Sequence, residues 1–222
     1  MDKKTGEMDR RTFLKSTLAT GAGLALTGAM GGLAWGKTQS DGGIADLPLT
    51  ELSKMIQRGE LTSKGLVEIY LGRIQKYGGT KGLNAYITVA GDAALRQAEE
   101  LDRLAKAGNF KGPLHGLPIG VKDNLDTQDM RTTGGSKILA QWTPKQDAHV
   151  VQKLKDAGAI ILGKTNMHEF AFGITTNNTN YGPARNPYDP SRIPGGSSGG
   201  SGIATAAGLC SGARGTGAGC MC

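Results

Sequence analysis

Apolar residues recur along this chain with two spacings, one typical of helices and one typical of short buried strands. Val67, Tyr70 and Ile74, for example, share one face of a helix. Thr62 lies just before them and can cap that helix with its hydroxyl oxygen. Such patterns predict helices over residues 50–58, 62–77, 92–107, 147–157 and 200–207. Apolar runs predict strands over residues 85–90, 117–121 and 159–162.

Helices that alternate with apolar strands indicate an α/β fold, in which helices cover a sheet. Residues 173–200 interrupt this alternation, and their many Asn, Pro and Gly residues predict a long loop. With 222 residues the chain can bury one core. We therefore divide it into a leader, residues 1–40, and a single α/β region, residues 41–222.

The leader has the features of an export signal. Arg10 and Arg11 form a twin-arginine pattern, and no charged residue occurs from position 16 to position 36. That uncharged stretch is rich in Gly, Ala and Thr, so it is less apolar than most transmembrane helices. We expect export by the twin-arginine machinery to the periplasm or the extracellular space. An uncleaved membrane anchor is the alternative.

Charge and cysteine content exclude other classes of protein. The net charge is +7, and the basic residues are scattered without interleaved aromatic residues, so no nucleic-acid partner is expected. Three histidines lie far apart, and the three cysteines all fall near the end of the chain. Neither set has the spacing of metal ligands. We expect no metal and no cofactor, and we interpret Cys210, Cys220 and Cys222 as part of an irregular tail.

The most informative segment is residues 193–201, where Ser197 and Ser198 are surrounded by four glycines. Such a loop can present N–H groups and hydroxyls to a small ligand, although its composition also fits a flexible linker. Residues 195–199 match the G-x-S-x-G nucleophile elbow of α/β-hydrolases as well. The two prolines before them disfavour the buried strand that this elbow requires, so it stays an alternative.

A second pattern, at residues 158–165, is the phosphate-loop motif G-x-x-x-x-G-K-[ST]. That motif needs a loop whose N–H groups wrap a phosphate. Here the intervening residues are Ala, Ile, Ile and Leu, which favour a buried strand. We therefore reject a phosphate site and expect Lys164 at the end of a strand.

Several motifs occur in a fixed order around the serine loop. They are G-P-L-H-G-L-P-I-G-V-K-D-N at residues 112–124, G-K-T-N-M-H-E-F-A-F-G at 163–173, and Y-G-P-A-R-N-P-Y-D at 181–189. With these motifs the chain resembles the amidase signature family from about residue 47 to residue 208. The resemblance implies an α/β fold with a mixed central sheet flanked by helices, incomplete in this chain.

The resemblance also implies a reaction, the hydrolysis of carboxylic amide C–N bonds through an acyl-enzyme. Lys122 corresponds to the general base, and burial favours the neutral lysine that a base requires. Ser197 corresponds to a bridging serine with a cis peptide, which relays a proton between the lysine and the nucleophile. Ser198 would support it. The residues that correspond to the lining of the substrate site are Thr133, Gly134, Gly135, Ser136, Asn166 and Met167.

The chain departs from the family pattern at the nucleophile. The family's serine lies in a G-[ST]-D-T-G-G-S element, and its position here is Met221. A thioether cannot be deprotonated, so Met221 cannot replace a serine nucleophile. The adjoining oxyanion region corresponds to Ala218, Gly219 and Cys220.

We therefore expect a truncated or frame-disrupted amidase without hydrolytic activity, whose substrate class is a small amide and whose full-length parent can form a homodimer. Truncation would expose sheet edges and apolar strand faces, for instance at residues 159–162. Two alternatives remain: a component of a glutamyl-tRNA amidotransferase that resembles its A subunit, and a catalytically dead, amidase-like binding protein. The leader counts against the first alternative, because translation takes place in the cytoplasm.

Overall fold

The computed structural model describes residues 43–79 and 82–216. No helix in these ranges is long and apolar enough to cross a lipid bilayer. The leader lies outside the described residues, and so do the positions expected around the nucleophile, Ala218, Gly219, Cys220 and Met221.

All five helices predicted from apolar spacing are present, with ends that differ from the predictions by one or two residues. They are α2 (Leu49–Gln57), α3 (Ser63–Tyr77), α4 (Gly91–Lys106), α5 (His149–Asp156) and α6 (Gly199–Ala206). Two 3-10 helices are η1 (Ile44–Asp46) and η2 (Glu169–Ala171). Thr62 caps α3 as predicted, because its Oγ1 accepts a hydrogen bond from the N–H of Gly65 at 3.1 Å.

Four strands form the central sheet in the order β1-β3-β2-β6. They are β1 (Tyr86–Val89), β3 (Ile160–Thr165), β2 (Pro118–Lys122) and β6 (Gly212–Arg214). β2 runs parallel to β3 and to β6, whereas β1 runs antiparallel to β3. The fold is therefore α/β with a mixed sheet, as predicted.

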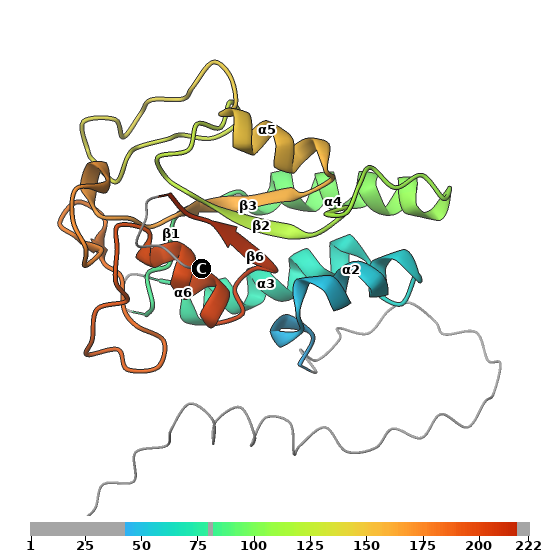
Figure 1. Cartoon of the computed structure of the whole chain (residues 1–222), viewed down its shortest axis with the longest axis horizontal. Coiled ribbons are helices and arrows are strands. Elements are labelled where there is room, and N and C mark those ends of the chain that lie inside the picture. The colour runs from blue at the N-terminus through green and yellow to red at the C-terminus, as the bar shows by residue number, and fades with distance from the viewer. Residues whose placement is uncertain (1–42, 80–81, 217–222) are drawn as a thin grey trace, which may run out of the picture. The chain divides into compact units, whose positions relative to one another are not determined.

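Helices cover both faces of this sheet (Figure 1). On one face, Val151 of α5 packs on Val121 and Ile161 in a small apolar cluster. On the other face, Ile160 and Leu162 belong to a larger core to which α2, α3, α4 and α6 contribute. Alternate residues of β3 thus point to opposite layers, and both layers are apolar. This explains why consecutive residues at the start of the strand are all apolar.

The prediction that residues 159–162 would have exposed apolar faces is wrong, because all four are buried between these layers. The strand is also longer than predicted and continues through Lys164 to Thr165. Within the predicted loop 173–200, two residue pairs form a small antiparallel ribbon, β4 (Asn177–Asn178) and β5 (Gly182–Pro183). Cys210 does not belong to an irregular tail, since it is buried in the larger core just before β6.

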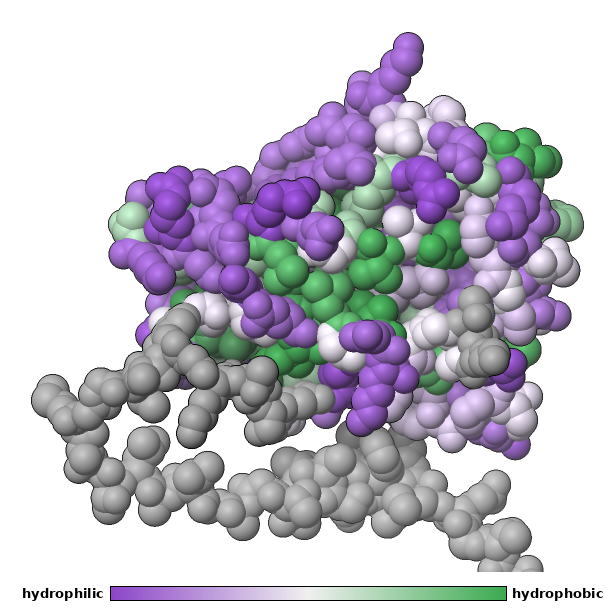
Figure 2. Space-filling view, turned by 180° about the vertical axis from the view of Figure 1, so that it is seen from behind, coloured by the Kyte–Doolittle hydropathy of each residue, from purple (hydrophilic) through white to green (hydrophobic). Residues whose placement is uncertain are grey.

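Hydrophobic residues also reach the surface. Figure 2 shows a hydrophobic area on the face opposite to the view of Figure 1, bordered by hydrophilic residues. Among the described residues, the most exposed large apolar side chains are Phe172, Ile138 and Ile174.

Candidate active site

Lys122 and Ser197, which are 75 positions apart in sequence, are in direct contact. Lys122 is the last residue of β2 and has no exposed surface. Its Nζ donates a hydrogen bond to Ser197 Oγ at 2.6 Å and another to the carbonyl oxygen of Thr216 at 3.3 Å. A buried amine next to a partly buried hydroxyl is an arrangement in which a proton can pass between the two groups.

The serine loop is held by backbone and side-chain hydrogen bonds. Its Gly196–Ser197 peptide bond is cis, and the carbonyl oxygen of Ser197 accepts from the N–H of His168 at 3.0 Å. Thr176 Oγ1 donates to the carbonyl oxygen of Gly195 at 2.7 Å and accepts from the N–H of Gly199 at 2.9 Å. These hydrogen bonds hold the loop in one conformation before α6, so it is not a flexible linker.

Gly200 lets α6 approach the end of β3 closely. Its N–H donates to the carbonyl oxygen of Asn166 at 3.0 Å. A Cβ at Gly200 would meet the backbone of Asn166 and would lie 2.6 Å from the carbonyl oxygen of Ala85. A side chain at this position would push α6, and with it Ser197, away from the sheet.

Ser198 contacts the segment that follows β6. Its Oγ donates to the carbonyl oxygen of Thr216 at 2.9 Å and accepts from the N–H of the same residue at 3.2 Å. Asn124 Nδ2 donates to Thr216 Oγ1 at 3.1 Å. Thr216 thereby joins Lys122, Ser198 and Asn124, mostly through its backbone. Its residue type matches the Ser/Thr position of the family's nucleophile element.

The segment Thr133–Gly134–Gly135 packs against the residue that follows Lys122. Asp123 Oδ2 accepts from both the N–H, at 3.1 Å, and the hydroxyl of Thr133. The carbonyl oxygen of Asp123 accepts from the N–H of Gly134 at 3.0 Å. Both glycines have positive φ, 60° and 71°, a conformation that favours glycine. Asn178 Nδ2 then donates to the carbonyl oxygen of Gly135 at 2.8 Å.

Asn166, Met167 and Ser136 are all buried. Asn166 Nδ2 donates to the carbonyl oxygen of Asn84 at 3.0 Å, so its side chain links the residue after β3 to the segment before β1. The carbonyl oxygen of Met167 accepts from Asn178 Nδ2 at 2.8 Å. One asparagine side chain, Asn178, therefore connects the two predicted lining segments, 133–136 and 166–167.

A second buried lysine, Lys164, belongs to β3, the strand that neighbours β2. Its Nζ donates to the carbonyl oxygen of Leu125 at 2.6 Å, to Thr127 Oγ1 at 3.1 Å and to Thr132 Oγ1 at 2.6 Å. It also lies 3.7 Å from Asp123 Oδ1, and neither of these two side chains has exposed surface. Because Lys164 belongs to a strand, rejecting the phosphate-loop pattern was correct.

Burial dominates the ionisation of this pair. Burial lowers the pKa of Lys164 to about 8, although Asp123, Asp126 and Asp129 act to raise it. Burial likewise raises the pKa of Asp123, against the hydrogen bonds from Thr133 and the charge of Lys164. With a pKa of about 8, Lys164 is mostly protonated at pH 7, and it faces the carboxyl group of Asp123.

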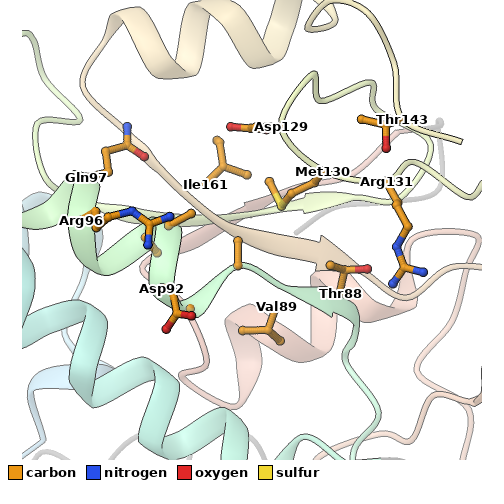
Figure 3. Close-up of a pocket in the computed structure, with 14 residues that line it drawn as sticks. Thr88, Val89, Asp92, Arg96, Gln97, Asp129, Met130, Arg131, Thr143 and Ile161 are labelled. Carbon is orange, nitrogen blue, oxygen red and sulfur yellow. The ribbon is translucent and has the colours of Figure 1, made fainter. Parts of the chain in front are cut away.

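A separate hollow of about 470 Å³ lies at the beginning of α4 (Figure 3). Residues of α4 and β1 line one part of it, and the loop after β2 lines another; they include Asp92, Arg96, Gln97, Thr88, Val89, Asp129, Met130 and Arg131. It contains side chains of both charges and none of the predicted site residues. We therefore place the candidate active site at Lys122 and Ser197 and not in this hollow.

Comparisons with known proteins agree with this fold and these motifs. The family model described as Amidase matches residues 65–220. A model of the twin-arginine translocation signal sequence matches residues 7–27, which supports export by that route. The chain belongs to the amidase family.

Relatives and solved structures of this family cover most of the chain. The A subunit of glutamyl-tRNA(Gln) amidotransferase from Thermobifida fusca is 48% identical over 161 residues, which are 72% of this chain and 32% of the relative. Its counterpart from Acidothermus cellulolyticus is 49% identical over 157 residues, 71% of this chain and 31% of the relative. The native peptide amidase from Stenotrophomonas maltophilia superposes with a TM-score of 0.70 at 40% identity, covering 75% of this chain and 35% of that one. The chain thus spans about a third of the length of the relatives it matches.

Proposed function

We propose that Lys122 and Ser197 form the proton relay of an amidase that hydrolyses carboxylic amide C–N bonds. The single observation that carries this proposal is the 2.6 Å hydrogen bond between Lys122 Nζ and Ser197 Oγ. The amide substrate lies against the segments 133–136 and 166–167. Residues 1–40 act as the export signal and 41–222 as part of the amidase domain, which works in the periplasm or the extracellular space.

In this mechanism neutral Lys122 takes a proton from Ser197 Oγ, which takes one from the nucleophile. The nucleophile's oxygen forms a bond to the amide carbon, and the carbonyl π electrons move to the carbonyl oxygen. When that intermediate collapses, the C–N bond breaks and the relay returns a proton to the leaving amine. Water then releases the acyl group along the same path. Donors near the carbonyl oxygen stabilise its negative charge.

The position of the nucleophile distinguishes this chain from such an enzyme. At the family's serine position stands Met221, which has no proton that the relay could remove. We therefore propose that the chain binds amides between the relay and the 133–136 segment but does not complete the hydrolysis by itself.

Two measurements on the purified 222-residue chain test this proposal. The first follows the backbone resonances of the ¹⁵N-labelled protein while benzamide is added, and we expect shifts in Gly134 and Gly135. The second measures ammonia released from acetamide, benzamide and glutamine, and we expect none above a protein-free blank. Ammonia release that disappears in Lys122→Met would contradict the assignment of the nucleophile. Absence of resonance shifts would contradict the amide site.

A second candidate function is supply of ammonia from glutamine, as in the A subunit of a glutamyl-tRNA amidotransferase. The names of the relatives at 48% and 49% identity favour it. The twin-arginine signal counts against it, because tRNA is charged in the cytoplasm. Resonance shifts with glutamine but not with benzamide would support this candidate over the first. A catalytically dead binding protein predicts shifts with an amide that are independent of Lys122.

A further inference from the structure

Lys164 is a buried cation that the proposed relay does not use. Its three hydrogen bonds go to Leu125, Thr127 and Thr132, which lie in the loop between β2 and α5. A lysine ammonium has three N–H donors, so these acceptors use all of them. Such saturation fixes the amine in one place and leaves no proton for a further acceptor.

Asp123, the residue that follows β2, faces Lys164. One carboxylate oxygen accepts both hydrogen bonds of Thr133. The other, Oδ1, is buried without a hydrogen bond and faces Lys164 Nζ at 3.7 Å. The charges of Lys164 and Asp123 therefore attract each other.

We propose that Asp123 and Lys164 are a pair of positioning residues that fix the segment Thr132–Gly135 against the end of β2. Asp123 is the neighbour of Lys122 in sequence, so the segment is fixed to the same strand end that carries the candidate base. That the segment is a wall of an amide site rests on the proposed function. That the ion pair sets its conformation does not.

The chemistry of buried ion pairs favours positioning over stabilisation. Desolvation of two charges offsets most of their attraction, so apolar pairs of similar volume are often as stable. The hydrogen bonds of Asp123 and Lys164, in contrast, have fixed directions. They therefore determine the conformation of the loop after β2. Asn178 Nδ2 donates to the carbonyl oxygens of both Gly135 and Met167. A fixed Gly135 therefore also helps to fix the position of Met167.

The test compares Asp123→Asn, Lys164→Met and the double variant Asp123→Asn/Lys164→Met in the full chain. Amide hydrogen exchange is measured by NMR at Thr133 and Gly135 and, as a reference, at Tyr70 and Ile74 of α3. Each single change leaves one buried charge unpaired, and we expect a lower thermal midpoint and faster exchange in both regions. In the double variant we expect the midpoint and the α3 exchange to recover. Exchange at Thr133 and Gly135 should stay at least tenfold faster than in the unmodified chain.

Two further variants keep the test decisive if a single change prevents folding. Thr133→Val removes only the hydroxyl that links Asp123 to the N–H of Gly135, and should accelerate exchange at Gly135 at least tenfold. Lys164→Arg keeps the charge and should protect the segment better than Lys164→Met. Recovery of slow exchange at Thr133 and Gly135 in the double variant would overturn the proposal, because the pair would then contribute only stability. No amide is added, so this outcome is independent of the proposed function.

Discussion

Lys122 and Lys164 lie near the carboxyl ends of neighbouring parallel strands, and neither has exposed surface. Lys164 pairs with Val121 in the sheet register, and Lys122 pairs with Thr165. Residues that pair across parallel strands point to the same face of a sheet, and successive residues of one strand point to opposite faces. Lys164 therefore shares a face with Val121, and Lys122 lies on the opposite face. Lys122 thus meets the serine loop before α6, and Lys164 meets the turns after β2.

Their partners differ more than their burial. Lys122 contacts the hydroxyl of a partly buried serine, which can both give and take a proton. Lys164 contacts a carbonyl oxygen and two threonine hydroxyls, and faces a carboxylate. Burial at a strand end therefore does not define a base. The oxygens around the amine separate the candidate relay from the positioning pair.

The largest effect should come from removing the charge of one lysine. Lys164→Met leaves Asp123 buried without its partner, and breaking a buried ion pair lowers the free energy of unfolding by about 3 to 5 kcal/mol. In Lys122→Met the hydrogen bonds to the neutral oxygens of Ser197 and Thr216 are lost, at about 1 kcal/mol each. Urea unfolding at pH 7 measures both. Equal losses would contradict the distinction between the two lysines.

A pH series separates the same two lysines. The pKa of Lys164 is lowered to about 8 from an ordinary value of 10.5. Between these values the unfolded chain binds more protons than the folded one, so this group makes the free energy of unfolding rise with pH. The contribution is complete above the unfolded value and is lost as pH falls through about 8. Over the whole interval it corresponds to about 3 kcal/mol.

The measurement is urea unfolding from pH 7.5 to 9.5 in the unmodified chain and in both methionine variants. We expect the part of the rise that comes from Lys164 to remain in Lys122→Met and to be lost in Lys164→Met. An unchanged rise in Lys164→Met would show that another group causes it.

A backbone change should affect the Lys122 side alone. Gly200→Ala forces α6 away from β3, and overpacking of this kind destabilises by about 1 to 3 kcal/mol. Gly72→Ala in α3 is the matched control, since a Cβ at Gly72 meets nothing within 4 Å and alanine favours a helix by about 1 kcal/mol. Thermal unfolding measures both, and NMR should show changed resonances near Ser197 but not near Thr132. A neutral Gly200→Ala would contradict the close approach.

The smallest effect is expected at the serine beside the relay. Ser198→Ala removes the two hydrogen bonds to Thr216, and we expect a loss of about 1 kcal/mol in the free energy of unfolding. Backbone amide exchange at Thr216 should become faster, because its N–H donates to Ser198 Oγ. Unchanged exchange at Thr216 would indicate that Ser198 does not hold this segment.

Apolar spacing predicted the helices and the three longer strands, because each buries a continuous stripe or run. β6 was not predicted, since Gly-Ala-Arg has no apolar pattern and pairs only because β2 offers an edge. The ribbon β4–β5 was missed for the same reason. Residues 159–162 were expected to be exposed because a truncated chain would lack the elements that cover them, whereas α5 and the helices of the larger core cover them here.

The contact between Lys122 and Ser197 was implied by the resemblance to the amidase signature family, but the surrounding network was not. Thr216 matches the Ser/Thr position of the family's nucleophile element, but its hydrogen bonds to Lys122 and Ser198 use backbone atoms, which the residue type does not predict. Asp123 and Lys164 did have a signal, namely a charged residue at the end of each of two parallel apolar strands. The sequence did not show that β3 continues to Thr165. It therefore did not show that Lys164 is buried within the strand rather than exposed at its end.

The contact between Lys122 and Ser197 is tested most directly by NMR of the lysine side-chain nitrogens in the full chain. Spectra of the unmodified chain and of Ser197→Ala are compared, with Lys122→Met and Lys164→Met used to assign the two buried signals. We predict that Ser197→Ala shifts the Lys122 Nζ signal and accelerates the exchange of its protons, while the Lys164 signal stays in place. A Lys122 signal that is unaffected by the loss of the serine hydroxyl would contradict the proposed relay.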